Sequence, residues 1–287
     1  MQTTAYRIFE PQTVQTSVVF ASPHSGCDYP EWFIRRSLLN AHTIRSSEDA
    51  YVDQLFADAP KYGAPFLVAR APRALLDLNR AAEELDPALI QGVRKVGHNP
   101  RVASGLGVIP RVVANGRAIY HGKRTRTEAD ARIDTYWRPY HSALKGLLDN
   151  ARHRFGEAIL IDCHSMPREA VETATRRGVQ RPELVLGDRF GAAADVELGD
   201  QIEAAFLKAG FVVSRNTPVA GAYVTQHYGR PLKAQHAIQI EIDRSLYMDE
   251  ATIQPHSDFD IFRTRLTEVV AQIARLGQPG ANSLAAE

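Results

Sequence analysis

Two histidines follow short apolar runs of the chain, and histidines in such places are candidate metal ligands. His24 lies in the turn-forming sequence PHSG after residues 17–22 (SVVFAS), and His164 lies in CHSMP after residues 158–162 (AILID). A catalytic zinc ion usually takes three protein ligands from histidines and carboxylates and leaves a fourth position for water. His24 and His164 therefore predict two ligands of a catalytic metal.

The third ligand of such a site would be a carboxylate, and three acids follow His24. Glu48 and Asp49 open a segment with helical spacing, residues 47–62, and Asp53 lies one turn further along. Asp49 and Asp53 would then face one side of a helix. Acids also favour a helix start without any metal, because they interact well with its N-terminal dipole. Spacing alone leaves the third ligand open.

The two cysteines, Cys27 and Cys163, lie close to these histidines and raise a rival, a closed structural zinc site with two cysteines and two histidines. Strand alternation predicts, however, that Cys163 points away from the face of Asp162 and His164, as a buried thiol. Two cysteines are also too few for a disulfide framework and suit a reducing compartment.

A basic segment offers groups that could bind an acidic substrate. The sequence DLNR, residues 77–80, follows a predicted strand at residues 64–69, and Arg73 lies just upstream. Arginine binds carboxylates through two parallel hydrogen bonds, so Arg80 with Asn79 predicts a clamp for a carboxylate or an oxyanion. The alternative is a network of surface salt bridges.

Glu241 is the candidate general base. It lies in QIEIDR, where alternation puts Gln239, Glu241 and Asp243 on one face of a strand and the two isoleucines on the other. A carboxylate in a cleft beside a zinc-bound water can take a proton from it. On an edge strand, the same face would only meet solvent. The preceding loop, residues 216–229, either closes on a substrate with Tyr223 or forms a plain hairpin.

Strands alternate with helices along the chain, and this order predicts an α/β fold. We expect three layers, with helices on both faces of a mixed, mostly parallel sheet and ligands at the carboxyl ends of its strands. One catalytic domain over residues 1–276 and a flexible tail over 277–287 suit this length. The expected helices cover residues 47–62, 128–155, 195–209 and 259–276, and further strands cover 211–213 and 237–243.

The charge of the chain is nearly balanced, with 34 Lys and Arg against 33 Asp and Glu. No strong field would attract nucleic acid or an anionic membrane. No segment approaches the ~18 to 20 apolar residues that span a bilayer, and the start of the chain lacks a signal-peptide pattern. We therefore expect a cytoplasmic protein that acts on a small molecule; the oligomeric state stays open.

Seven segments, taken in order between about residues 17 and 249, resemble the N-formylglutamate amidohydrolase family. They are SPHSG (22–26), ED (48–49), DLNR (77–80), IDCHSMP (161–167), GDRFG (187–191), residues 216–229 and QIEIDRSLYM (239–248). The resemblance implies a fold similar to zinc carboxypeptidases and aspartoacylases, with one catalytic zinc ion.

The metal ligands that the resemblance implies are His24, His164 and one acid. Of Glu48 and Asp49, the family pattern favours Asp49. Carboxypeptidase-like sites place the acid three residues after the first histidine, where this chain has Cys27, so the position of the acid departs from that pattern.

The implied reaction is hydrolysis of a small N-acyl amino acid, N-formyl-L-glutamate, to formate and L-glutamate. Glu241 would act as base and then as acid, and Arg80 would bind a carboxylate or polarise the scissile carbonyl. The implied and expected substrate contacts are Asn79, Arg73, Arg244, Tyr223 and Asn216. Alternatives are a deacylase of another N-acyl amino acid, a small carboxypeptidase, or a non-catalytic zinc-binding or ligand-binding protein of this fold.

Overall fold

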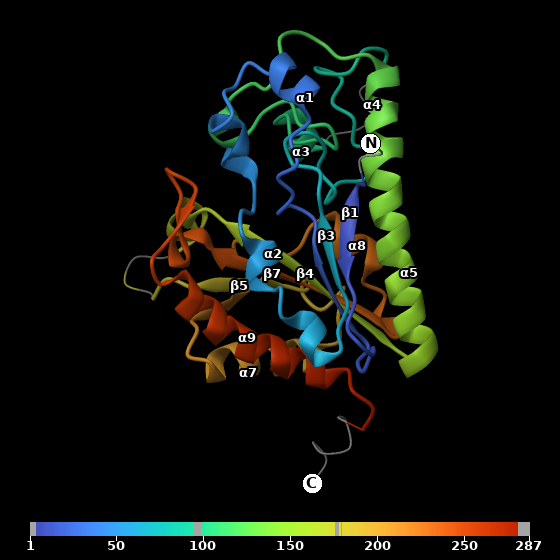
Figure 1. Cartoon of the computed structure of the whole chain (residues 1–287), viewed down its shortest axis with the longest axis vertical. Helices are drawn as coiled ribbons and strands as arrows, with labels where there is room; N and C mark the ends of the chain where they lie inside the picture. Colours follow the sequence, from blue (N-terminus) through green and yellow to red (C-terminus); the bar gives the residue numbers. More distant parts are fainter. Residues whose placement is uncertain (1–3, 95–98, 176–177, 179, 281–287) are drawn as a thin grey trace. The chain divides into compact units, whose positions relative to one another are not determined.

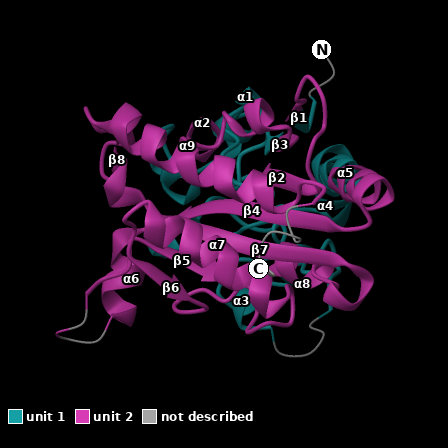
Figure 2. Ribbon diagram, turned by 90° about the horizontal axis from the view of Figure 1, so that it is seen from below, with its two compact units in different colours: residues 1–7, 23–50, 68–143 teal, residues 8–22, 51–67, 144–287 magenta. Residues whose placement is uncertain are grey.

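The structure, a computed structural model, describes residues 4–94, 99–175, 178 and 180–280. The chain divides into two compact units that alternate along the sequence (Figure 2). Unit 1 comprises residues 1–7, 23–50 and 68–143, and unit 2 comprises residues 8–22, 51–67 and 144–287. The single catalytic domain over residues 1–276 stays a prediction, and residues 281–287 of the expected tail lie outside the described residues.

A seven-stranded sheet has the strand order β1-β3-β2-β4-β7-β5-β6, with most of its strands in unit 2 (Figure 2). β2 pairs with β4 and β4 with β7 in parallel, β5 and β6 are also parallel, and β5 and β7 are antiparallel. The predicted mixed, mostly parallel sheet is confirmed. The strands are β1 Tyr6–Phe9, β2 Val18–Ser22, β3 Phe66–Ala69, β4 Ala158–Met166, β5 Leu184–Gly187, β6 Val213–Arg215 and β7 Gln235–Asp243. Met248–Asp249 (β8) and Gln254–Pro255 (β9) form a separate ribbon.

Burial explains why these apolar runs form central strands. Every residue of β2, β4 and β5 is buried, and in β7 only Gln235 is half-buried. Successive side chains of a strand point to opposite faces, so both faces are covered. β7 lies between β4 and β5, so Glu241 is not on an edge strand, and the solvent-face alternative for it is wrong.

Helices of unit 2 pack through apolar stripes. The helix α9 (Phe259–Leu276) buries Phe262, Leu266, Val269 and Ile273, the helical spacing that the sequence predicted. It contacts β2, the short helix α2 (Val52–Leu55) and α7 (Val196–Lys208), and Figure 1 shows α7 beside α9. Helix α8 (Tyr223–Tyr228) contacts β4 and β7, and α6 covers Arg168–Ala174.

Unit 1 contains short helices and loops and the first part of one long helical run, up to residue 143. The run comprises α4 (Arg126–Arg132), a π-helical segment (Ile133–Trp137) and α5 (Arg138–Phe155), so the expected helix over 128–155 is confirmed. Arg132, almost fully buried, lies 5.2 to 5.7 Å from the ring centroids of Trp32, Phe33 and Tyr120. This cation–π cluster attaches α4 to α1 (Glu31–Arg36). The remaining α-helix is α3 (Pro100–Ala103), and 3-10 turns cover Ala114–Gly116, Pro231–Lys233 and Arg244–Leu246.

Three expected elements differ from the structure. The helix over 47–62 is broken into 3-10 helices at Thr43–Ser47 and Ala59–Tyr62 with α2 between them, because Tyr51 has a left-handed φ of 66°. Asp49 therefore lies before α2 and shares no helix face with Asp53. β4 runs on to Met166, so His164 lies within a strand. The segment 216–229 ends in α8 and is not a hairpin.

Other bounds shift by one or two residues, as for β6, which begins at Val213 rather than at 211. Among the described residues, no helix combines the length and the apolar character that a membrane crossing requires.

Candidate active site

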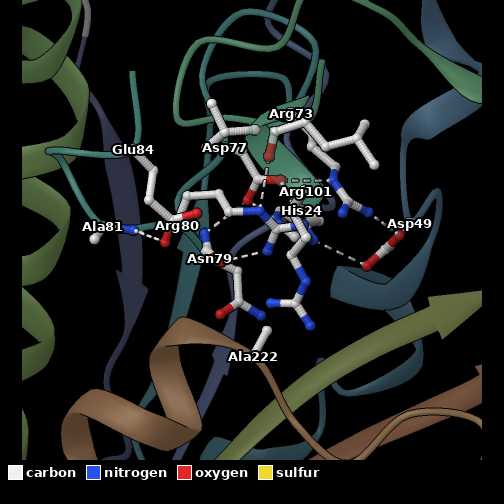
Figure 3. Close-up of polar contacts among 12 residues, drawn as sticks. His24, Asp49, Arg73, Asp77, Asn79, Arg80, Ala81, Glu84, Arg101 and Ala222 are labelled. Carbon is white, nitrogen blue, oxygen red and sulfur yellow. Dashed lines mark hydrogen bonds and ion pairs between the residues drawn. The ribbon is translucent and has the colours of Figure 1, made fainter. Parts of the chain in front are cut away.

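His24 is held between two aspartates of unit 1. It lies two residues after β2 and is 1% exposed. Its Nε2 lies 2.7 Å from Oδ1 of Asp77, and its Nδ1 lies 3.5 Å from Oδ2 of Asp49 (Figure 3). A carboxylate on one ring nitrogen fixes the tautomer and the orientation of the ring and raises the basicity of the other nitrogen. Asp77 thus fixes the ring of His24 with its Nδ1 toward Asp49.

The neighbouring acids Glu48 and Asp49 have different partners. Glu48 accepts hydrogen bonds from Nε and Nη2 of Arg45, each at 3.0 Å. The backbone of Glu48 is extended (φ −66°, ψ 145°), and consecutive side chains of an extended chain point to opposite sides. Asp49 consequently faces His24 while Glu48 faces Arg45. This arrangement favours Asp49 over Glu48 as the third ligand.

Asp77 is a buried carboxylate surrounded by donors and positive charge. Besides His24, its Oδ1 accepts from the backbone N–H of Asn79 (2.8 Å), and its Oδ2 accepts from Nε of Arg73 (3.2 Å). Burial alone would raise the pKa of Asp77, but the charges of His24, Arg80 and Arg73 hold it well below the usual range. Asp77 therefore stays ionised and orients His24, a function that sequence reasoning missed.

The guanidinium of Arg80 is tethered to backbone carbonyls. Its Nε donates to the carbonyl of Leu106 (2.9 Å) and its Nη1 to that of Asn79 (2.7 Å), while Nη2 lies 4.0 Å from Asp77 (Figure 3). Burial lowers the pKa of Arg80, and the charge of Asp77 opposes that effect. A fixed, buried cation of this kind is suited to binding an anionic group.

Two side chains in the part of the long helical run that belongs to unit 1 contact the backbone of the DLNR segment. Nε1 of Trp137, at the end of the π-helical segment, donates to the carbonyl of Arg80 at 2.9 Å. Nε2 of His141, one turn later, lies 2.9 Å from the carbonyl oxygen of Leu78. The ring centroids of Trp137 and His141 are 4.0 Å apart. These contacts restrict the backbone on which Arg80 is placed.

The second histidine and the candidate base are adjacent on the sheet of unit 2. His164 of β4 and Glu241 of β7 are register partners, as are Asp162 and Gln239. Register partners on parallel strands point to the same face, so Glu241 lies beside His164. Nε2 of His164 is 3.0 Å from Oδ2 of Asp162, and this pairing repeats that of His24 with Asp77. The i, i+2 spacing of Asp162 and His164 was the signal for it in the sequence.

Cys163 lies on the opposite face of β4, as alternation predicted. It is fully buried, and burial followed by the nearby charge of Asp162 raises the pKa of its thiol well above the ordinary value. A thiol held protonated is a poor metal ligand. Cys27 is exposed. The structure thus adds nothing in favour of a closed site with two cysteines.

Arg244 and Tyr223 remain candidates for substrate contact in unit 2. Arg244 follows β7 and is buried, with Nε 3.2 Å from Oγ of Ser165 and Nη2 donating to the Ser165 carbonyl at 3.3 Å. Tyr223 begins α8, where its ring stacks on that of His227. Each of these two side chains thus contacts another residue of unit 2.

The side-chain amide of Asn216 forms its hydrogen bonds within a strained loop. Its Oδ1 accepts from the backbone N–H groups of Asp188 (3.1 Å) and Phe190 (3.2 Å), and its Nδ2 donates to Oδ1 of Asp188 (2.8 Å). Arg189, Phe190 and Asn216 all have left-handed φ values of 57° to 59°. Such strain persists only where hydrogen bonds overdetermine the backbone. These bonds argue against the expected substrate contact by Asn216.

Asn216→Gly tests this interpretation, because glycine tolerates the left-handed φ and removes only the side chain. We expect a loss of about 2 to 3 kcal/mol in the free energy of unfolding at pH 7, from the lost hydrogen bonds to a carboxylate and two amides. Urea unfolding measures this loss. The KM for substrate should stay within about threefold of wild type; unchanged stability with a tenfold higher KM would instead support a substrate contact.

The pH dependence of that loss follows from Asp188. Burial raises its pKa, but hydrogen bonds from Asn216 and Arg215 bring it below the usual value. A lowered pKa in the folded state contributes stability above the unfolded value of about 3.9. This contribution is lost as the pH falls through the folded value. The difference between Asn216→Gly and wild type should therefore be largest near neutral pH and shrink below about pH 4.

Histidine and carboxylate donors are the ligands that catalytic divalent ions prefer. Among the residues that the structure describes, the donors that could hold a metal ion are His24, Asp49 and His164. Two nitrogens and one oxygen suit zinc, and related divalent ions accept similar donors.

Comparison with known proteins adds three findings. A family model described as N-formylglutamate amidohydrolase matches residues 16–248. The N-formylglutamate deformylases of Pseudomonas putida and Pseudomonas aeruginosa are 28% identical over 236 residues and 29% identical over 237, each covering 81% of this chain and 82% of the relative. The crystal structure of the N-formylglutamate amidohydrolase from Ralstonia eutropha JMP134 is 32% identical, with a TM-score of 0.89 over 96% of this chain and 99% of that one.

Proposed function

Because this chain belongs to the N-formylglutamate amidohydrolase family, and so is a hydrolase of an amide bond, we propose that it converts N-formyl-L-glutamate and water to formate and L-glutamate. The observation that carries the proposal is the register pair His164 and Glu241, which sets a buried carboxylate beside an oriented histidine. A carboxylate in such a place can accept a proton from an attacking water.

The metal that we propose is a single zinc ion bound by His24, Asp49 and His164. In support, the Nε2 atom of each histidine faces an aspartate, which assigns the Nδ1 atoms to the ion. β2 and β4, the strands that precede and carry the two histidines, are parallel neighbours within unit 2. When bound, zinc would acidify a coordinated water and polarise the scissile carbonyl.

Glu241 carries the proton through the proposed reaction. It accepts a proton as the water oxygen bonds to the formyl carbon, and it gives that proton to the nitrogen as the carbon–nitrogen bond breaks. Glu241 is thereby returned to its starting state. At neutral pH the substrate has two carboxylates, and we assign Arg80 with Asn79 to one of them. Arg73, Arg244 and Tyr223 are the proposed further contacts.

Hydrolysis of a small panel of substrates by the zinc-loaded protein tests this function. The panel is N-formyl-L-glutamate, N-acetyl-L-glutamate and N-formyl-L-leucine, with released amino acid and bound zinc measured in the same samples. We expect the highest kcat/KM for N-formyl-L-glutamate. A higher value for the acetyl compound would indicate a different deacylase, and zinc binding without hydrolysis of any N-acyl amino acid would indicate a non-catalytic relative.

A further inference from the structure

Gln239 of β7 connects the proposed base to the loop before α8. Its side chain is 2% exposed, and its backbone already belongs to the strand pairing of the sheet. Its Oε1 accepts a hydrogen bond from the backbone N–H of Ala222 at 3.1 Å, and its Nε2 donates to Oε1 of Glu241 at 2.7 Å. One buried amide therefore bridges two parts of unit 2 that are 19 residues apart in sequence, Ala222 and Glu241.

The orientation of this amide follows from the chemistry of its neighbours. A backbone N–H can only donate, so the atom of Gln239 that faces Ala222 must be the oxygen. The nitrogen then necessarily faces Glu241, whose carboxylate can accept. The hydrogen bond thus holds Oε1 of Glu241 toward Gln239.

The loop that contains Ala222 also packs against the end of β5. Gly187 of β5 is the register partner of Gln239, and a Cβ at this position would lie 2.8 Å from the backbone carbon of Ala220. The backbone N–H of Arg189 donates to the Ala220 carbonyl at 2.8 Å. Ala222 is thus held close to the sheet, one residue before Tyr223.

We propose that Gln239 is a positioning residue that orients Glu241 and couples it to the loop leading into Tyr223. This inference rests on the proposed function, in which Glu241 is the base and Tyr223 a substrate contact. A substrate that engages the start of α8 would then act on the same hydrogen-bonded chain that sets the carboxylate.

Two variants separate the two bonds of Gln239. Gln239→Glu keeps an acceptor for Ala222 but places a second carboxylate against Glu241, and two adjacent carboxylates hold a shared proton to higher pH. We expect the acidic limb of its kcat/KM profile to move up by about one pH unit or more, with activity at pH 7 about tenfold lower and recovering at higher pH. Gln239→Met removes both bonds, so its loss of kcat should persist at every pH and its KM should rise.

Hydrogen exchange at the backbone amide of Ala222 gives a readout that does not need activity. Gln239→Met should accelerate this exchange by about tenfold or more, whereas Gln239→Glu should leave it near wild type. Gln254→Glu, the same change on an exposed residue of β9, is the matched control and should alter neither profile nor exchange.

The outcomes distinguish the inference from the proposed function. A wild type without activity on N-formyl-L-glutamate overturns the function, while accelerated exchange in Gln239→Met would still support the bridge. An active wild type whose Gln239→Glu variant has an unshifted profile overturns the inference alone. If both variants lose activity and thermal stability to the same extent at all pH values, Gln239 has only a structural role, and the inference is wrong.

Discussion

Glu241→Gln should lower kcat on N-formyl-L-glutamate by about 10³- to 10⁴-fold, the upper part of the range for general acid–base catalysis. The effect is large because one carboxylate both accepts the proton of the water and returns it to the leaving nitrogen. In free energy, the loss corresponds to about 4 to 5.5 kcal/mol of transition-state stabilisation. Steady-state kinetics on zinc-loaded protein, with zinc quantified in the same samples, measures it.

The fold and the metal should survive this substitution. Glutamine keeps the size of the side chain, and Glu241 is not one of the proposed ligands, so zinc content should equal that of wild type. Glu172→Gln is the matched control, since it makes the same change at an exposed ion pair of α6 with Arg168, where such pairs contribute little. Retention of more than a tenth of the wild-type kcat in Glu241→Gln would remove Glu241 from the mechanism.

Asp49→Asn should abolish tight zinc binding, whereas Glu48→Gln should preserve it. Mutation of a residue that only hydrogen-bonds to a metal ligand lowers metal affinity by about 10- to 100-fold. Asp49 is itself one of the three proposed ligands, so its substitution should lower zinc affinity by more than that. Glu48 instead forms a two-pronged ion pair with Arg45, so its substitution costs folding stability rather than zinc affinity. Competition with a chelator measures zinc affinity, and activity at saturating zinc is recorded alongside it.

These adjacent residues are each other's control, because they differ by one position and by the direction of the side chain. Zinc loss in Glu48→Gln with retention in Asp49→Asn would reverse the assignment. Equal retention in both would place the third ligand elsewhere.

Much of the secondary structure was predictable because its signal is local. The stripe of Phe262, Leu266, Val269 and Ile273 recurs at helical spacing, and α9 has the bounds that this period predicted. Alternation in QIEID and DCH correctly separated the polar from the apolar side chains of β7 and β4. Residues 47–62 show where such reasoning fails, because the left-handed backbone of Tyr51 interrupts a helix that the spacing of the sequence predicted.

What the sequence by itself determined is the set of reactive residue types and the strands or loops that carry them: His24 and His164 near strand ends, Glu241 on an alternating strand, and arginines after β3. The tertiary structure alone decided which partners these residues have. Asp77 orients His24 from 53 residues away, and Gln239 reaches Ala222 across 17. Such pairs depend on strand order and register, and periodicity within one segment holds no information about them.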